Sequence, residues 1–179
     1  MCHISAHRSK FDIIEWTGTV AISHHGREIM IHLSEMEIRV LTEALDDEYR
    51  AWATYDQIIA DFGETPPFSN IREAEARHIE ALCVLFSKYG LSVPTNPWPG
   101  KVERYSTLQA ACEAGVAAEI ANGEMYDRLL GMTRRQDIIA VLRNLQAASQ
   151  QRHLPAFQRC AQRVSETGAR HRRGRGNQS

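Results

Sequence analysis

The sequence predicts an all-α protein that folds as a four-helix bundle with one long crossover connection between the second and third helices. Four stretches place apolar residues at alternating steps of three and four, the period of a helix that buries one face. The 179 residues, of which 43% are apolar, are enough for one domain with a single core. Between the second and third stretches lies the Pro-rich segment LSVPTNPWPGKVERY. Its reach of roughly 50 Å exceeds the ~30 Å length of a typical bundle helix, so it can cross the whole bundle.

The first predicted helix runs from Ser34 to Phe62. Ser34 is a suitable N-cap because Glu37 follows three residues later and completes a capping box. Gly63 and two prolines soon after it end the helix. The inward stripe is apolar apart from one carboxylate and consists of Ile38, Leu41, Leu45, Glu48, Trp52, Tyr55, Ile59 and Phe62.

The second predicted helix runs from Ser69 to Tyr89, with Gly90 as the residue that follows its last turn. A carboxylate and an imidazole interrupt its inward stripe, which consists of Ile71, Glu75, His78, Leu82, Leu85 and Tyr89. The third runs from Ser106 to Leu130, and its stripe consists of Leu108, Cys112, Gly115, Glu119, Asn122, Tyr126 and Leu129.

The fourth predicted helix runs from Thr133 to Val164. Pro155 lies inside it, and we expect a local kink there because proline cannot donate a backbone hydrogen bond. Its inward stripe consists of Ile139, Leu142, Gln146, Gln150, His153, Phe157, Cys160 and Val164.

The ends of the chain fall outside the predicted bundle, which spans residues 33–166. Residues 1–32 are a poorly defined extension in which a short hairpin could turn at His25-Gly26. Residues 167–179 form a basic tail without apolar anchors, which we expect to be mobile. Because residues 159–179 hold six Arg and one Glu, the net charge of −1 hides an acidic bundle and a basic end. Through charge alone, this tail could contact nucleic acid weakly.

Hydropathy and cysteine usage predict the compartment. No window approaches 18 consecutive apolar residues, and the N-terminal stretch lacks the apolar run of a secretory signal. We therefore expect a cytoplasmic protein without a membrane partner. The four cysteines, Cys2, Cys83, Cys112 and Cys160, are widely spaced without a C-x-x-C pair, and we interpret the last three as reduced core residues.

Each of the four inward stripes is interrupted near its middle by side chains that can bind a metal. A buried carboxylate must be paired or must bind a cation, because its isolation in a core costs several kcal/mol. Residues three apart lie on one helix face, so a Glu-x-x-His segment can direct both side chains at one metal pair. The candidate ligands are Glu48, Glu75, His78, Glu119, Gln150 and His153. Tyr55 and Tyr126 are candidate hydrogen-bond donors to the carboxylates, with core packing as the alternative.

At these residues the chain resembles the rubrerythrin branch of the ferritin-like superfamily, and most closely the uncharacterised bacterial ferritin-like families related to it. The resemblance covers residues 33–164 and rests on the segments EYRAWATY, PFSNIREAEARHIEAL, AGVAAEIANGEMYDRLL and NLQAASQQRHLPAFQRC. It implies a ferritin-like bundle with a di-iron carboxylate site and an activity of the ferroxidase or peroxide-reducing type, with iron, dioxygen or peroxide as its partners.

The resemblance also implies a role for each candidate ligand. Glu75 and a carboxylate from the fourth helix would bridge the two metals, and Glu48 and Glu119 would complete the two sites. His78 and His153 would be terminal ligands.

One residue departs from this pattern, because Gln150 stands where a bridging carboxylate is expected. The remaining carboxylates supply a charge of −3 against the +4 of two divalent ions, and a glutamine oxygen bridges metals poorly. The sequence therefore leaves open an altered site with two irons, a site with one metal, and a bundle that has lost its metal. Manganese and zinc are alternatives to iron. The alternative function is a non-catalytic bundle that serves protein interaction or self-association, for example as a homodimer.

Overall fold

The computed structural model describes residues 21–24, 27–30 and 32–175, with side chains described for residues 32–164. The bundle is formed by α1 (Glu35–Phe62), α2 (Phe68–Lys88), α3 (Leu108–Gly131) and a composite fourth helix. This fourth helix comprises α4 (Gln136–Ala148), the π-helical turn η1 (Ser149–His153) and α5 (Leu154–Arg175).

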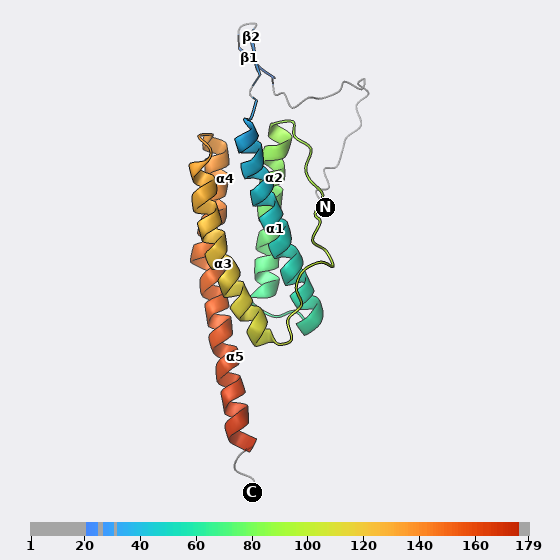
Figure 1. Ribbon diagram of the computed structural model, residues 1–179, viewed down its shortest axis with the longest axis vertical. Helices are drawn as coiled ribbons and strands as arrows, with labels where there is room; N and C mark the ends of the chain where they lie inside the picture. Colours follow the sequence, from blue (N-terminus) through green and yellow to red (C-terminus); the bar gives the residue numbers. More distant parts are fainter. Residues whose placement is uncertain (1–20, 25–26, 31, 176–179) are drawn as a thin grey trace.

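The connection between α2 and α3 crosses the bundle as predicted. α1 and α2 run antiparallel, and residues 89–107 then pass along the outside of the bundle to the end at which α2 begins. α3 therefore runs parallel to α2, and the composite fourth helix returns antiparallel to α3 (Figure 1). The predicted four-helix architecture with one long crossover is confirmed.

Local signals set the helix ends close to their predicted positions. The Ser34 hydroxyl accepts a hydrogen bond from the Glu37 backbone N–H at 3.2 Å, and the Glu37 carboxylate accepts one from the Ser34 N–H at 2.9 Å. This is the predicted capping box. At the other end of α1, Gly63 adopts a φ of 85°, a conformation that glycine adopts without the steric penalty of a side chain.

Regular secondary structure extends beyond the predicted bundle at both ends of the chain. β1 (Ala21–His24) and β2 (Arg27–Met30) pair antiparallel and flank the predicted turn at His25-Gly26, which itself lies outside the described residues. At the C-terminal end, the backbone of α5 stays helical to Arg175, beyond the boundary predicted at residue 166.

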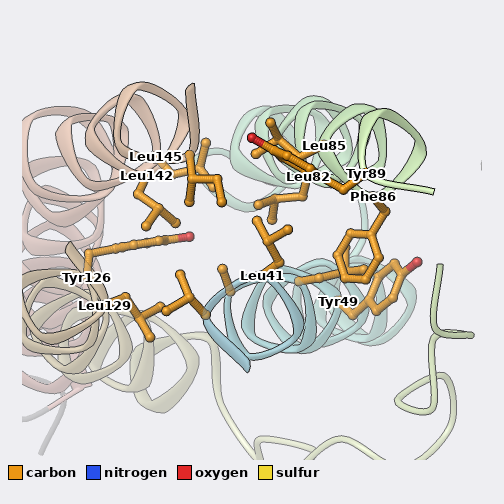
Figure 2. Packing of buried hydrophobic residues seen from close by; sticks show 14 residues of the cluster. Leu41, Tyr49, Leu82, Leu85, Phe86, Tyr89, Tyr126, Leu129, Leu142 and Leu145 are labelled. Carbon is orange, nitrogen blue, oxygen red and sulfur yellow. The ribbon is translucent and has the colours of Figure 1, made fainter. Parts of the chain in front are cut away.

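Two hydrophobic clusters divide the interior of the bundle. The upper cluster, drawn in Figure 2, joins all four helices near the N-terminal end of α1 and contains Val40, Leu41, Ala44, Leu45, Tyr49, Leu82, Leu85, Phe86, Tyr89, Tyr126, Leu129, Ile138, Leu142 and Leu145. The lower cluster contains Tyr55, Ile58, Phe68, Ile71, Ala111, Cys112, Phe157 and Cys160. Every helix of the bundle contributes to both clusters, so each must pass through the layer between them.

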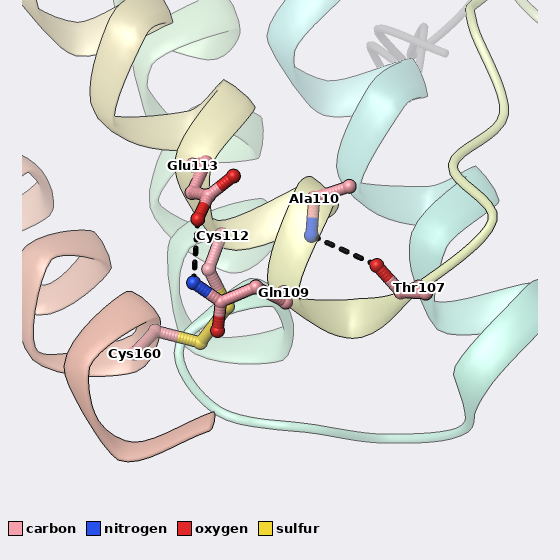
Figure 3. The surroundings of a disulfide bond; sticks show 6 residues. All are labelled: Thr107, Gln109, Ala110, Cys112, Glu113 and Cys160. Carbon is pink, nitrogen blue, oxygen red and sulfur yellow. Dashed lines mark hydrogen bonds between the residues drawn. A yellow bond between two sulfur atoms is a disulfide. The ribbon is translucent and has the colours of Figure 1, made fainter. Parts of the chain in front are cut away.

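The interpretation of Cys112 and Cys160 as reduced core residues is wrong. The two residues form a disulfide that joins α3 to α5 inside the lower cluster (Figure 3). Their Cα atoms are 5.7 Å apart because the two helices pack side by side, a separation typical of a disulfide. Cys83 is buried and lies outside this disulfide. Sequence spacing could not reveal the pair, since 48 positions separate its members.

Within the described part of the chain, no helix is both long and apolar enough to cross a membrane.

Candidate metal centre

Three buried carboxylates occupy the layer between the two clusters. On α1, Glu48 comes one helical turn after Leu45, a member of the upper cluster. On α2, Glu75 comes one helical turn after Ile71, a member of the lower cluster. Glu119 lies on α3, and all three side chains belong to residues that are at most 4% exposed. An ionised carboxylate at such depth needs a compensating charge or hydrogen bond. The structure therefore places the predicted acidic residues where only paired carboxylates are stable.

Two histidines supply this compensation. His78 Nδ1 lies 2.7 Å from Glu75 Oε2 and 3.2 Å from Glu48 Oε2. His153 Nδ1 lies 3.2 Å from Glu75 Oε1 and 3.7 Å from Glu119 Oε1. The two imidazole rings are stacked with centroids 5.7 Å apart. Each histidine thus stands between two carboxylates, and Glu75 contacts both histidines.

The five side chains form two overlapping groups with the geometry of metal ligands. In the first group, one ligand atom each from Glu48, Glu75 and His78 lie within 4.8 Å of one another. The second group joins Glu75, Glu119 and His153 in the same way. Glu75 belongs to both groups, as a carboxylate that bridges two metals would.

Burial and mutual contact shift the pKa values of these groups in opposite directions. Burial, followed by the nearby Glu75 carboxylate, raises the pKa of the Glu48 carboxyl to about 8. Burial would also raise the pKa of Glu75, but hydrogen bonds from His153, His78 and Glu48 outweigh it and lower the pKa to about 2. Without a metal, Glu75 is therefore the ionised partner of both imidazoles.

The histidines show the complementary shift. Burial alone would lower the pKa of each imidazole, but contact with the carboxylates reverses the effect. Hydrogen bonds to Glu48 and Glu75 raise the pKa of His78 to about 10. Hydrogen bonds to Glu119 and Glu75 raise the pKa of His153 to about 9. At neutral pH, protons on the two rings hold the positive charge that the carboxylates require.

The two candidate tyrosines donate hydrogen bonds to the outer carboxylates. Tyr126 Oη donates to Glu48 Oε1 at 2.5 Å, and Tyr55 Oη donates to Glu119 Oε1 at 3.1 Å. Burial and the neighbouring carboxylates raise the pKa of both phenols well above their usual range, so both remain donors. The rings also pack in the upper and lower clusters respectively. Each tyrosine thus combines the two roles considered from the sequence, hydrogen-bond donation to a carboxylate and packing in the core.

The structure does not bring Gln150 into the group of ligands. Its amide Nε2 donates to the Glu119 backbone carbonyl at 2.5 Å and to Ser149 Oγ at 3.0 Å. The side chain lies against Gly123 on α3, where a Cβ atom would stand 2.7 Å from Nε2. A side chain at position 123 would therefore displace the Gln150 amide from this place.

Ser149 takes the position beside His153 that sequence reasoning gave to Gln150. Ser149 is 3% exposed and lines the same cavity as His153. The π-helical turn η1 accounts for this difference, because its wider i→i+5 turn leaves Ser149, four residues before His153, on the His153 face and turns Gln150 away from it. Pro155 was the signal for this distortion, since its ring excludes the normal α-helical hydrogen bond to Gln151. The structure has a π-turn that ends two residues before Pro155, close to where the sequence predicts a local kink.

A cavity of about 360 Å³ connects the ligand group with the crossover connection. It lies between α1 and α3, and its inner end is formed by the five candidate ligands and Ser149. Small residues of α3, among them Ala111, Ala114, Gly115 and Ala118, leave this space open. Its outer end is lined by residues of the crossover, including Trp98, Lys101 and Tyr105. The ligand group can therefore be reached by small molecules without the opening of a helix pair.

Solved structures with the same arrangement identify the fold. The chain is similar to the hypothetical protein MJ0754 of Methanococcus jannaschii, with a TM-score of 0.67 and 22% sequence identity over 80% of this chain and 87% of that one. It is also similar to the bacterioferritin BfrA of Mycobacterium tuberculosis, with a TM-score of 0.63 and 20% identity over 76% of this chain and 90% of that one. The fold is ferritin-like.

A third similar structure is the conserved hypothetical protein rv2844 of Mycobacterium tuberculosis, with a TM-score of 0.59 and 14% identity over 70% of this chain and 90% of that one. No family model matches the sequence, and no curated protein matches it either. The likeness to solved structures therefore establishes the fold, and the function must be argued from the residues of the site.

Proposed function

We propose that this ferritin-like chain binds two iron ions between its helices and uses them to oxidise Fe(II) or to react with dioxygen or peroxide. We place it in the rubrerythrin-related branch on the motifs around its candidate ligands. The observation that carries the proposal is the position of Glu75, which is shared by two groups of ligand atoms. A carboxylate in this position can bind one metal through each of its oxygens.

The chemistry of the donor set fits such a metal pair. Glu48, Glu75 and Glu119 supply oxygen donors, and His78 and His153 each supply an imidazole nitrogen, with Nδ1 as the ring atom that faces the carboxylates. Mixed carboxylate and imidazole donors on four helices suit Fe(II), Mn(II) and Zn(II), and are the donors of di-iron carboxylate bundles. When bound, a redox-active pair supplies or accepts electrons in reactions of dioxygen or peroxide.

The other residues of the site hold these donors in place. Tyr126 and Tyr55 each donate a hydrogen bond to an outer carboxylate and so orient it towards the centre of the bundle. The clusters above and below the layer exclude water from the helices on either side. The cavity leaves one route for a small oxidant or for Fe(II).

The charge of the site supports a second candidate function, a non-catalytic bundle that serves interaction or self-association. Both histidines are already paired with carboxylates, so the metal-free site contains its own countercharges. Ser149 adds no charge at the place of a fourth carboxylate. A bundle with this site can fold without metal, and metal analysis separates the two functions.

The decisive experiment compares the metal content of wild-type protein with that of Glu75→Gln, both produced in iron-supplemented cells. We expect two irons per chain in the wild type and none in Glu75→Gln, because the variant removes the one ligand common to both groups. Glu73→Gln is the matched control, since Glu73 lies on the same helix with 62% of its side chain exposed. It should retain both irons.

Two further variants test the assignment of the outer ligands. Glu48→Gln and Glu119→Gln should each retain one metal, because each residue belongs to one group only. Wild-type protein without stoichiometric iron, manganese or zinc would contradict the proposal and leave the non-catalytic bundle. Two metals in Glu75→Gln would show that the site lies elsewhere.

A further inference from the structure

The disulfide lies on the same helix faces as two of the candidate ligands. Cys112 precedes Glu119 by seven residues on α3, and Cys160 follows His153 by seven residues in the composite fourth helix. Seven residues make about two helical turns, or roughly 10 Å along the axis. Because the two helices are antiparallel, both separations point in the same direction from the ligand group. The disulfide is therefore about two turns below the candidate metals.

Aromatic side chains fill the space between the disulfide and the ligand group. The Tyr55 hydroxyl donates to Glu119 Oε1 at 3.1 Å, and the Tyr55 ring lies 5.4 Å from the Phe157 ring, centroid to centroid. Both rings belong to the lower cluster together with Cys112 and Cys160. Tyr55 thus contacts a candidate ligand at one end and packs in the cluster of the disulfide at the other.

The sulfur atoms are shielded from solvent and from the cavity. Cys112 is 0% exposed and Cys160 is 2% exposed. The cavity is lined by Ala111 and Gly115, on either side of Cys112 along α3, but by neither cysteine. An oxidant in the cavity therefore cannot reach a sulfur atom directly, and electrons would have to pass through the packed side chains between them.

We propose that Cys112 and Cys160 are a redox pair that supplies two electrons, by way of Tyr55, to peroxide held at the carboxylate and histidine group. This inference rests on the proposed function of that group. In the reaction, two S–H bonds break and one S–S bond forms, with the release of two electrons and two protons. Peroxide accepts them, its O–O bond breaks, and two water molecules form. An external dithiol returns the pair to its thiol form and is itself oxidised to a disulfide; because both sulfur atoms are buried in the folded bundle, it reaches them when α3 and α5 separate locally.

The test follows the thiols of the full chain in a Cys2→Ser/Cys83→Ala background, which leaves only the proposed pair. The protein is reduced, freed of reductant without air, loaded with two equivalents of Fe(II) and mixed with one equivalent of hydrogen peroxide. We expect two thiols per chain to be lost, and the loss to be at least tenfold slower in metal-free protein. Protein loaded with Zn(II), which cannot change its oxidation state, should react as slowly as metal-free protein.

Tyr55→Phe tests the path. It keeps the ring but removes the hydroxyl that contacts Glu119, and we expect thiol loss to slow at least tenfold with an unchanged iron content. Tyr105→Phe is the matched control, since Tyr105 packs against the same cluster and also lines the cavity. It should react at the wild-type rate. A wild-type rate in Tyr55→Phe would overturn the path through this residue.

The outcomes separate this inference from the proposed function. If two irons bind and the thiols persist, or disappear equally fast with Zn(II), the redox pair is overturned while the metal site stands. The disulfide is then a structural link between α3 and α5. If no iron binds and the thiols react as they do in Glu75→Gln, both proposals are overturned.

Discussion

Protons and metal ions compete for the same residues at the centre of the bundle. The imidazoles of His78 and His153 and the carboxyl of Glu48 all have pKa values above their ordinary ones. Metal binding requires neutral imidazoles and ionised carboxylates, so it must displace these protons. In the metal-free site, protons therefore occupy the imidazoles and the carboxyl that would otherwise bind metal.

The pKa shifts predict how the free energy of unfolding of metal-free protein depends on pH. A group whose pKa is raised by folding stabilises the protein fully below its unfolded-state pKa, and this contribution is lost as the pH rises through the folded-state pKa. With pKa values of about 10 and 9, His78 and His153 should make the protein less stable as the pH rises from about 6.5 to 10. Glu48, with a pKa of about 8, acts in the same direction.

Urea unfolding of metal-free and metal-loaded protein between pH 6 and pH 10 checks this prediction. The decline should be present without metal and should be reduced or reversed with metal, whose affinity rises as the competing protons leave. An equally stable metal-free protein at pH 6 and pH 10 would show that the histidines are not paired with the carboxylates.

Among the elements, η1 decides which residue of the fourth helix faces the site. In a continuous α-helix, residues 150 and 153 would share a face, as residues 75 and 78 do on α2. The π-turn instead places Ser149 beside His153 and directs Gln150 towards the backbone of α3. A carboxylate that completes the site should therefore be introduced at position 149.

We expect Ser149→Asp to bind the metal pair roughly tenfold to a hundredfold more tightly than wild type, a range typical of changes around metal ligands. The reason is that a fourth carboxylate brings the charge of the site to −4, which balances two divalent ions. Gln150→Glu should give no such gain. Its carboxylate would face the Glu119 carbonyl in place of an amide donor, and this should lower the free energy of unfolding by about 1–3 kcal/mol.

Metal titration and urea unfolding of the two variants check this pair of predictions. Tighter binding in Gln150→Glu than in Ser149→Asp would mean that the fourth helix is α-helical around the site in the metal-bound protein.

At the scale of the whole molecule, the site and both clusters lie within residues 33–166 in the part of the chain that the structure describes. The five candidate ligands and every member of the two clusters lie in this range. The hairpin of β1 and β2 precedes it, and the last residues of α5 follow it (Figure 1). We therefore propose residues 33–166 as the functional unit, with residues 1–32 and 167–179 as appendages.

A protein truncated to residues 33–166 should keep the metal content of the full chain. Its melting temperature should stay within about 4 °C of the full-length value, because 1 kcal/mol shifts the melting temperature of a chain of this size by roughly 2–4 °C. Metal analysis and thermal unfolding check both values. Loss of metal on removal of either end alone would assign that end to the site.

The sequence by itself determined the helices, their ends and the five residues that meet between the clusters. These features depend on local rules: the capping box at Ser34, the glycine after α1, and the period that places Glu75 and His78 on one face. Because each rule acts over a few residues, the printed sequence contains all the information it requires.

The tertiary structure alone decided the Cys112–Cys160 pair, the position of Ser149 in the site and the place of Gln150 outside the ligand group. These features depend on which helices pack together and on the hydrogen-bond register of the fourth helix at η1. The helix packing depends on contacts between residues far apart in the chain, which no local period contains. The register beside Pro155 departs from an ideal α-helix, so the period of an ideal helix assigned the site to residue 150, whereas the folded chain presents residue 149.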